Sequence, residues 1–211
     1  MQPVNGWPIC ACLLIILSFM GCSTSGQPGS SENKMTAVQA EKILIVYLSR
    51  TKNTKAVAEI IQKQTGGRLV ALELQNPYPQ DYQTTVDQVA RENASGFLPP
   101  LATVIDSIEK YEMIFLGFPT WGMQLPPPVK SFLKQYNLKG KTIAPFNTNA
   151  GYGIGSTFEE VKNLASGTRV LDGFSTRGGV ERDGVLFVME GDRLIQVQDQ
   201  VTSWIQNFKM P

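Results

Sequence analysis

The sequence predicts an α/β domain built on a doubly wound parallel sheet. Apolar runs rich in β-branched residues, typical of strands buried on both faces, alternate five times with segments of helical periodicity. The first run, Ile43 to Leu48, has no polar alternation and leads directly into a hydroxyl-rich loop and then a helix. Strands and helices that alternate in this way favour a parallel sheet with helices on both faces.

The opening strand is followed by a helix and a second strand. The helix places apolar side chains on one face, and the segment from Arg68 to Leu74 alternates as a strand does. The break at Asn76–Pro79 ends this strand. Asp81 is then expected to cap a helix with Tyr82, Val86 and Val89 turned inward.

The third and fourth strands are each followed by a loop and a helix. Met113 to Phe118 is the third strand, followed by the loop Pro119–Met123 and a helix that Pro126–Pro128 opens. Thr142 to Asn147 is the fourth strand, followed by the loop Thr148–Gly155 and a further helix.

The last part of the sequence predicts a fifth strand, a hairpin and a final helix. The strand is expected over Arg169–Phe174, and the stretch Gly178–Glu190 suggests an extra hairpin around Asp183-Gly184. The final helix carries one apolar face, made of Leu194, Val197, Val201, Trp204, Ile205 and Phe208.

The composition excludes several classes of chemistry. The chain has 211 residues and a net charge of +1, so there is no electrostatic reason to expect a nucleic-acid partner. It has no histidine, which excludes a Ser-His-Asp triad and a histidine-ligated zinc. Its three cysteines, Cys10, Cys12 and Cys22, precede the domain, so a bound cofactor would have to supply any difficult chemistry.

The first residues are typical of an export signal. Residues 1–21 are uncharged, and the apolar stretch from Ile9 to Met20 is too short to span a bilayer. The signal ends in Gly21-Cys22, which resembles a bacterial lipobox and implies lipidation of Cys22. We therefore expect a signal peptide over 1–21, a flexible tether over 22–38 and the domain over 39–211, held at a membrane of the bacterial envelope. The alternative is a cytoplasmic product translated from Met35.

The loop after the first strand predicts an anion site. It lies between a buried strand and a helix N-terminus, where free backbone N–H groups and the helix dipole attract negative charge. Ser49, Thr51 and Thr54 add hydroxyl donors without adding charge. We therefore expect a phosphate group at this loop.

Two further loops should reach the same edge of the sheet, because ligands of such sheets bind beyond the carboxyl ends of the strands. One carries Trp121 beside Gly122, and the other carries Tyr152 between Gly151 and Gly153. Two aromatic side chains near a phosphate pocket suit a flat aromatic ring system with a phosphate tail. The alternatives are that Trp121 belongs to the core and Tyr152 to the surface.

Four segments together resemble the flavodoxin family. They are Ser49–Lys55 (SRTKNTK), Pro77–Tyr82 (PYPQDY), Pro119–Leu133 with its Pro-x-Trp loop, and the glycine-rich loop Thr148–Gly155. The similarity extends from about Glu41 to the end of the chain. It implies a five-stranded sheet of order 2-1-3-4-5, FMN as the cofactor and a redox function.

The resemblance also assigns roles to residues. It implies that Ser49, Thr51, Asn53 and Thr54 hold the FMN phosphate, that Trp121 and Tyr152 flank the isoalloxazine, and that the loop from Asn147 to Gly153 contacts its pyrimidine edge. The predicted cofactor site comprises Ser49, Arg50, Thr51, Lys52, Asn53, Thr54, Pro119, Thr120, Trp121, Gly122, Asn147, Thr148, Asn149, Gly151, Tyr152 and Gly153.

Two cations in the first loop, Arg50 and Lys52, each allow two interpretations. Lys52 replaces the usual loop glycine, which predicts a left-handed residue that carries a side chain. Arg50 and Lys52 either offset the phosphate charge or are simply solvated.

Three functions agree with these features. The first is an electron-transfer flavoprotein that passes electrons to a redox partner protein. The second is an FMN-dependent reductase of quinone-like acceptors that takes hydride from NAD(P)H. The third is a flavin-free interaction module on a lipid anchor. An exported location favours the first, because NAD(P)H is not supplied outside the cytoplasm.

Overall fold

The computed structural model describes residues 37–208, 210 and 211, with the exception of the Val38 side chain. The expected signal peptide over 1–21, the lipidation site Cys22 and the tether up to residue 36 lie outside the described residues. Among the helices that are described, none is long and apolar enough to cross a membrane.

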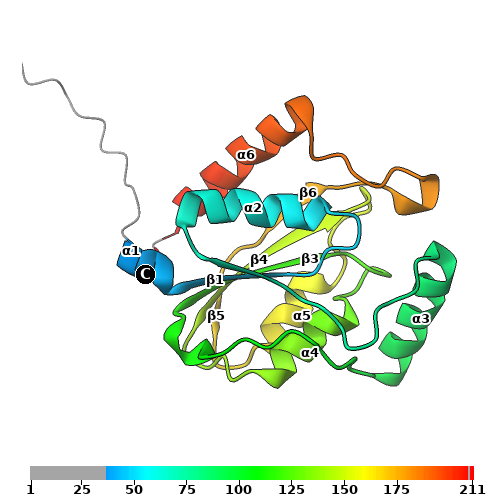
Figure 1. Cartoon of the computed structure of the whole chain (residues 1–211), viewed down its shortest axis with the longest axis horizontal. Helices are drawn as coiled ribbons and strands as arrows, with labels where there is room; N and C mark the ends of the chain where they lie inside the picture. Colours follow the sequence, from blue (N-terminus) through cyan, green and yellow to red (C-terminus); the bar gives the residue numbers. More distant parts are fainter. Residues whose placement is uncertain (1–36, 209) are drawn as a thin grey trace, which may run out of the picture. The chain divides into compact units, whose positions relative to one another are not determined.

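The described chain folds around one parallel sheet with the strand order β2-β1-β3-β4-β5 (Figure 1). This order confirms the expectation from the resemblance. The strands are β1 (Ile43–Tyr47), β2 (Arg68–Ala71), β3 (Met113–Pro119), β4 (Thr142–Asn149), β5 (Arg169–Val170) and β6 (Phe174–Arg177). The chain turns from β2 on one side of β1 to β3 on the other, so a topological switch point lies between β1 and β3.

The fifth strand is broken in two, whereas the sequence predicts one strand over Arg169–Phe174. Ile143 of β4 pairs with Val170, and Phe146 pairs with Phe174, so the outer strand has one more residue than β4 between these pairs. This is the geometry of a β-bulge. Pro145 explains why the bulge lies here. Ile143 faces the outer strand, because its carbonyl oxygen accepts a hydrogen bond from Leu171 N. Pro145, two residues further along β4, faces the outer strand as well but has no N–H to donate to it.

The second strand is also shorter than the predicted Arg68–Leu74, because β2 ends at Ala71. Beyond it, Glu73 N donates to Thr103 Oγ1 at 2.7 Å, and Leu74 forms an isolated antiparallel bridge with Leu101. The chain therefore leaves the parallel ladder to pair with the connector before β3.

Helices cover both faces of the sheet (Figure 1). On one face, α2 (Asn53–Thr65) and α6 (Gly191–Gln206) pack against alternate side chains of β1, including Ile43 and Ile45. On the other, α4 (Pro127–Gln135) and α5 (Thr157–Leu164) pack against Leu44 and Val46. The remaining helical elements are α1 (Ala37–Glu41), α3 (Tyr82–Ser95), and the short η1 (Ile108–Lys110) and η2 (Glu181–Asp183).

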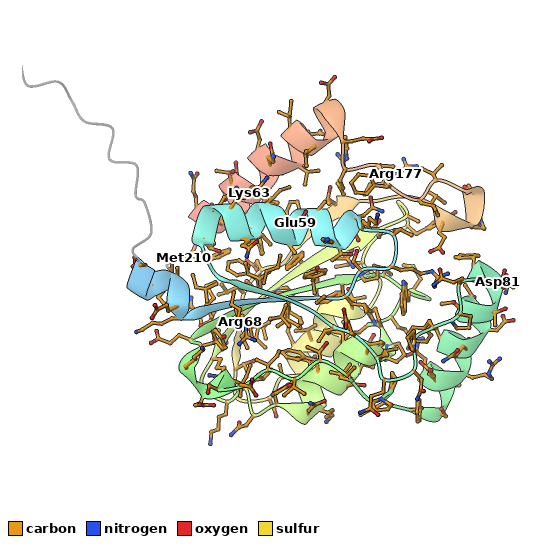
Figure 2. The ribbon with its side chains drawn as sticks, viewed as in Figure 1. Glu59, Lys63, Arg68, Asp81, Arg177 and Met210 are labelled. Carbon is orange, nitrogen blue, oxygen red and sulfur yellow. The ribbon has the colours of Figure 1, made fainter. Side chains whose placement is uncertain are left out.

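Side chains fill the space between these layers (Figure 2). The apolar face predicted for the last helix is confirmed: Val197, Val201, Trp204 and Ile205 are buried, and Leu194 and Phe208 are partly buried. Arg68 and Met210 lie toward one end of the sheet in this view, whereas Asp81 and Arg177 lie toward the other, where the strands end.

Helix α3 begins where the sequence predicts but faces the core differently. Asp81 caps it by accepting a hydrogen bond from Thr84 N at 2.8 Å. The expected inward positions of Tyr82 and Val86 are wrong, because these side chains are 36% and 39% exposed while Val89 is buried. The buried face of α3 consists of Thr85, Val89 and Glu92. Tyr82 and Val86 lie beside this face, on the adjacent side of the helix.

The hairpin suggested over Gly178–Glu190 is reduced to a tight turn. A single antiparallel bridge joins Val180 to Val185 around η2, and Gly184 closes the turn with φ 77°. We call residues 178–190 the post-β6 segment.

Candidate functional site

A cavity of about 440 Å³ lies at the carboxyl ends of β1, β3 and β4, at the switch point. Ten of the predicted site residues line it: Arg50, Thr51, Asn53, Thr54, Pro119, Thr120, Trp121, Gly122, Thr148 and Asn149. The other six, Ser49, Lys52, Asn147, Gly151, Tyr152 and Gly153, are not part of its lining.

The loop between β1 and α2 has the backbone geometry of an anion site. Lys52 is left-handed, with φ 66° and ψ −6°, which confirms the conformation that the sequence predicts at this position. Helix α2 begins immediately afterwards, and none of the backbone N–H groups of residues 51–54 donates to an atom of the described chain. Successive free N–H groups around a left-handed residue form a concave nest for an anion, and the helix dipole adds to the attraction.

Ser49 and Thr51 support this loop with their hydroxyls. Ser49 Oγ accepts a hydrogen bond from Lys55 N at 3.2 Å, in the first turn of α2. Thr51 Oγ1 accepts one from Asn53 Nδ2 at 2.9 Å, so the hydrogen of the Thr51 hydroxyl is free to donate into the cavity.

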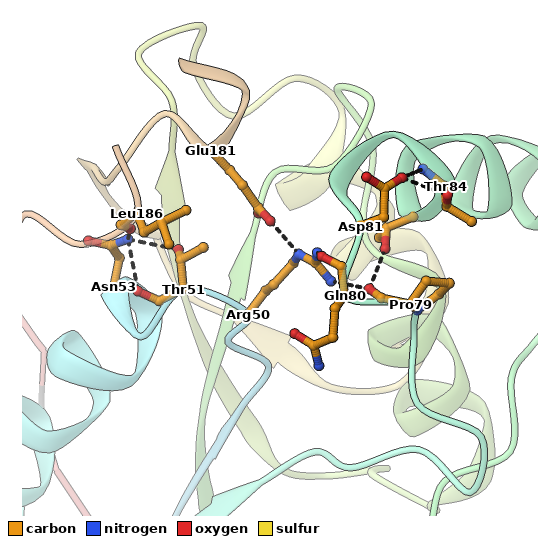
Figure 3. Close-up of polar contacts among 10 residues, drawn as sticks. Arg50, Thr51, Asn53, Pro79, Gln80, Asp81, Thr84, Glu181 and Leu186 are labelled. Carbon is orange, nitrogen blue, oxygen red and sulfur yellow. Dashed lines mark hydrogen bonds and ion pairs between the residues drawn. The ribbon is translucent and has the colours of Figure 1, made fainter. Parts of the chain in front are cut away.

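The Asn53 side chain binds other parts of the protein and has no hydrogen left to donate to an anion. It is 3% exposed. Its Nδ2 donates to Leu186 O at 2.7 Å (Figure 3). Its Oδ1 accepts from Val188 N at 3.1 Å. Asn53 therefore fastens the post-β6 segment to the loop between β1 and α2, which we call the anion loop. The Asn53 backbone N–H is the donor that remains for an anion.

Arg50 is neither a solvated side chain nor an exposed anion ligand. Its Nε pairs with Glu181 Oε1 at 2.7 Å, Nη1 donates to Pro79 O at 2.8 Å, and Nη2 donates to Gln80 O at 2.6 Å. Figure 3 shows the guanidinium between the post-β6 segment and the residues that lead into α3. The Arg50 side chain is 18% exposed, so the pair is largely withdrawn from solvent. Arg50 therefore fastens both walls of the cavity to the anion loop.

Two threonine hydroxyls meet at the inner end of the cavity. Thr54 Oγ1 and Thr148 Oγ1 are 2.8 Å apart, and both residues are buried. When two hydroxyls share one hydrogen bond, one hydrogen remains that can be donated elsewhere. Beside them, Asn147 is fully buried and donates to Phe118 O and Thr120 Oγ1, so it ties the loop after β3 to β4.

Trp121 lies on a tight two-residue turn that the surrounding chain holds in place. Trp121 and Gln124 pair through two backbone hydrogen bonds, and Gly122 and Met123 between them both have positive φ, 57° and 61°. Met123 O accepts hydrogen bonds from Ser156 N and Oγ at 2.9 and 3.2 Å. A β-carbon on Gly155 would lie 2.1 Å from this oxygen, so glycine is required there.

The two predicted aromatic residues are not brought together. The Trp121 ring is partly buried and lines the cavity, and it packs edge-to-face against Tyr78 with centroids 5.4 Å apart. Tyr152 is 65% exposed, and its hydroxyl accepts a hydrogen bond from Arg182 Nη2 at 3.1 Å. Tyr152 therefore lies outside the cavity in this structure, on a loop that Asn149 Oδ1 shapes by accepting from Gly151 N and Gly153 N.

Sequence reasoning missed one wall of the cavity. Helix α3 contributes Tyr82, Thr85, Val86, Val89, Ala90, Asn93 and Ala94, and the post-β6 segment contributes Gly178, Gly179 and Glu181. The available signal was the helical spacing of Tyr82 and Val86, which we assigned to the core together with Val89 because a helix usually buries its apolar stripe.

Glu160 of α5 supports the turn that carries Trp121. Its Oε1 accepts from Leu125 N at 3.0 Å and Ser156 Oγ at 2.6 Å, and its Oε2 pairs with Lys130 at 2.7 Å. Partial burial acts to raise the pKa of Glu160, but the hydrogen bonds from Lys130, Ser156 and Leu125 outweigh it and leave this pKa below its ordinary value.

The cavity offers the donors and surfaces that a phosphate-bearing ring compound requires. Free N–H groups and hydroxyls lie at one end, and Trp121 and apolar side chains lie along the rest. Within the described part of the chain, no group of three or more Cys, Asp or Glu residues is placed to hold a metal ion. Fold and site together define a doubly wound sheet with a cavity at its switch point, where such sheets bind their ligands.

The chain belongs to the flavodoxin family, whose members' sequence pattern it matches over residues 42–190. A flavodoxin of Synechocystis sp. is 24% identical over 127 residues, which cover 58% of this chain and 61% of that protein. A putative flavoprotein of Bacteroides uniformis shares the fold, with a TM-score of 0.64 at 22% identity over 79% of this chain and 99% of its own. A flavoprotein of Lactobacillus acidophilus, solved in complex with FMN, is 25% identical with a TM-score of 0.58, over 69% of this chain and 99% of its own.

The Glu160 contacts predict a stability that depends on pH. A carboxyl whose pKa is lowered by folding stabilises the protein above its unfolded pKa and loses this contribution as the pH falls through the folded value. Glu160→Gln should therefore lower the free energy of unfolding at pH 7 by about 1 kcal/mol. The difference from wild type should shrink below about pH 4.5, the ordinary value. Urea titrations from pH 7 to 3 measure it.

The neighbouring Glu159 is exposed and provides the matched control. Glu159→Gln should leave the free energy of unfolding nearly unchanged at every pH. A difference between Glu160→Gln and wild type that stays constant down to pH 3 would contradict the role of the charged carboxylate.

Proposed function

We propose that this protein binds FMN in the cavity and acts as an electron-transfer flavoprotein. The observation that carries the proposal is the row of free N–H groups at residues 51–54, which opens into the same cavity as Trp121. The volume of about 440 Å³ lies within the usual range for small-molecule sites, roughly 300–1,000 Å³. The Lactobacillus flavoprotein solved with FMN supports the assignment by similarity.

The residues divide between the two ends of the cofactor. The N–H groups of residues 51–54, the Thr51 hydroxyl and the remaining hydrogen of the Thr54–Thr148 pair would hold the phosphate. Trp121 and the turn at Gly122 would lie against the ring system, which supplies the redox chemistry when bound. A phosphate dianion that is held by several preorganised hydrogen-bond donors needs no compensating cation. This agrees with the structure, in which the Arg50 guanidinium is already paired with Glu181.

The charged groups of the cavity favour electron transfer over a reductase reaction. Arg50 and Glu181 are the charged residues of the lining, and they are paired with each other. No free acid or base among the described lining residues would therefore serve proton transfer to a reduced substrate. A redox partner protein that receives electrons directly needs no such group.

Thr51 provides the test of the phosphate site. Thr51→Val keeps the shape of the side chain and removes one hydroxyl donor to a charged group, a contact worth roughly 1.5–3 kcal/mol. FMN affinity should fall about tenfold or more, whereas riboflavin, which lacks the phosphate, should lose little. Quenching of flavin fluorescence on titration with apoprotein gives both dissociation constants. An equal loss of affinity for FMN and riboflavin would mean that this loop does not bind the phosphate.

The electron-transfer role has its own test. The FMN-loaded protein, reduced by light under anaerobic conditions, should pass electrons to a one-electron acceptor such as cytochrome c, followed by the absorbance of the reduced cytochrome. NADH or NADPH alone should leave the flavin absorbance unchanged. Steady oxidation of NAD(P)H with a quinone would instead favour the reductase, and failure to bind any flavin would favour the interaction module.

We also propose that the protein is an exported lipoprotein anchored at Cys22, which the order of apolar stretch, Gly21-Cys22 and polar tether supports. The full-length chain produced in a bacterium should sediment with membranes, and Cys22→Ser should not be processed or lipidated. Cys12→Ser, within the apolar stretch, is the matched control and should behave as wild type. A soluble, cytoplasmic product with residue 35 at its N-terminus would contradict the proposal.

A further inference from the structure

Helix α3 has a buried face and, beside it, a row of mainly apolar residues, and the fold accounts only for the buried face. Thr85, Val89 and Glu92 are buried against the rest of the protein. A second row, Tyr82, Val86, Ala90 and Ala94, repeats every four residues and so lies along one side of the helix. All four of these residues are exposed, and all four line the cavity. We call them the α3 stripe.

Protein packing does not explain the α3 stripe. Single apolar side chains on a surface are ordinary, but a continuous row of them along a concave surface indicates a binding site. The outer positions of the same helix, such as Asp87 and Arg91, are charged. The apolar character is therefore confined to the side that faces the cavity.

The rest of the chain holds the α3 stripe in a fixed position. At the start of the helix, Arg50 binds the carbonyl groups of Pro79 and Gln80. Near its end, Asn93 Oδ1 accepts from Lys130 Nζ at 3.1 Å.

A partly buried hydrogen-bonded pair, Tyr78 and Glu92, joins the helix to the Trp121 side of the cavity. Tyr78 donates its hydroxyl hydrogen to Glu92 Oε2 at 2.5 Å, and the edge of its ring packs on Trp121. Burial and this hydrogen bond raise the pKa of Tyr78, so the phenol stays protonated and remains the donor.

We propose that the α3 stripe is the second wall of the ring site, opposite Trp121 in the place assigned to Tyr152 from the sequence. The inference rests on the proposed function and identifies what the stripe binds: the flat isoalloxazine of a cofactor whose phosphate lies at residues 51–54. The cavity is continuous from that loop to Ala94. Ala90 and Ala94 are small and leave room for a ring face, while Tyr82 and Val86 add apolar surface beside it.

Ala90→Trp tests this proposal by filling the space beside the α3 stripe that the ring would occupy. Ala90 is exposed, so the larger side chain displaces ligand and not core. Affinities for FMN and riboflavin, measured by fluorescence titration, should both fall at least 50-fold, because both ligands carry the ring. Arg91→Trp places the same bulk on the adjacent outer face and should bind both flavins as wild type does. Unfolding curves of both variants check that the fold is kept.

Two further variants keep the proposal testable if Ala90→Trp does not fold. Val86→Ser removes apolar contact without adding volume and should weaken both flavins three- to tenfold. Tyr152→Ala should leave both affinities within twofold of wild type. A loss of affinity in Tyr152→Ala together with none in Val86→Ser would overturn the wall and support Tyr152 as the ring partner.

The outcomes separate this inference from the function on which it rests. If wild type binds neither FMN nor riboflavin, the proposed function fails and the wall fails with it. If wild type binds both flavins and a correctly folded Ala90→Trp binds them equally well, the proposed role of the α3 stripe is contradicted and the proposed function is not. Losses in Ala90→Trp and Val86→Ser with Arg91→Trp unchanged would support it.

Discussion

The structure depends on the burial of β1 on both faces. All five of its residues are buried, with Ile43 and Ile45 against α2 and α6 and with Leu44 and Val46 against α4 and α5. A strand enclosed in this way has parallel neighbours whose crossovers supply the covering helices. The consequence is that the loops after β1, β3 and β4 all emerge at one edge, and the anion loop joins the middle of the sheet directly to the start of α2.

This anchoring allows the anion loop to keep an unfavourable conformation. A left-handed residue that carries a side chain costs about 1 kcal/mol or more, and Lys52 has no side-chain cap of its own to offset it. The loop is fixed on both sides by Arg50 and Asn53, whose side chains are bound to the post-β6 segment. Two residues of the predicted cofactor site, Arg50 and Asn53, therefore use their side chains mainly to bind other parts of the protein. They fix the direction of the N–H groups between them.

The sequence predicted the parts of the fold that depend on local pattern. Buried runs such as Ile43–Leu48 and the cap at Asp81 are properties of a few adjacent residues. The left-handed Lys52 was expected from the resemblance, in which a glycine usually occupies this position. The break in the fifth strand was missed because it depends on Pro145 of a neighbouring strand, and sequence alone does not say which strands pair. Helix α3 was misassigned for the same kind of reason: Tyr82 and Val86 have the helical spacing of a core face, but only the tertiary arrangement shows that a cavity lies beside them.

The charges around the anion loop indicate how selectivity could arise there. Arg50 is paired with Glu181, and Lys52 is exposed, so the loop attracts an anion through N–H groups and hydroxyls at short range and not through a net positive field. Such donors bind an oxyanion of the right shape but attract distant anions only weakly. An apolar wall on α3 would add affinity only for a ligand that also has a flat ring. Together the two ends would favour a ligand that combines a phosphate group with an aromatic ring over a ligand that has only one of them.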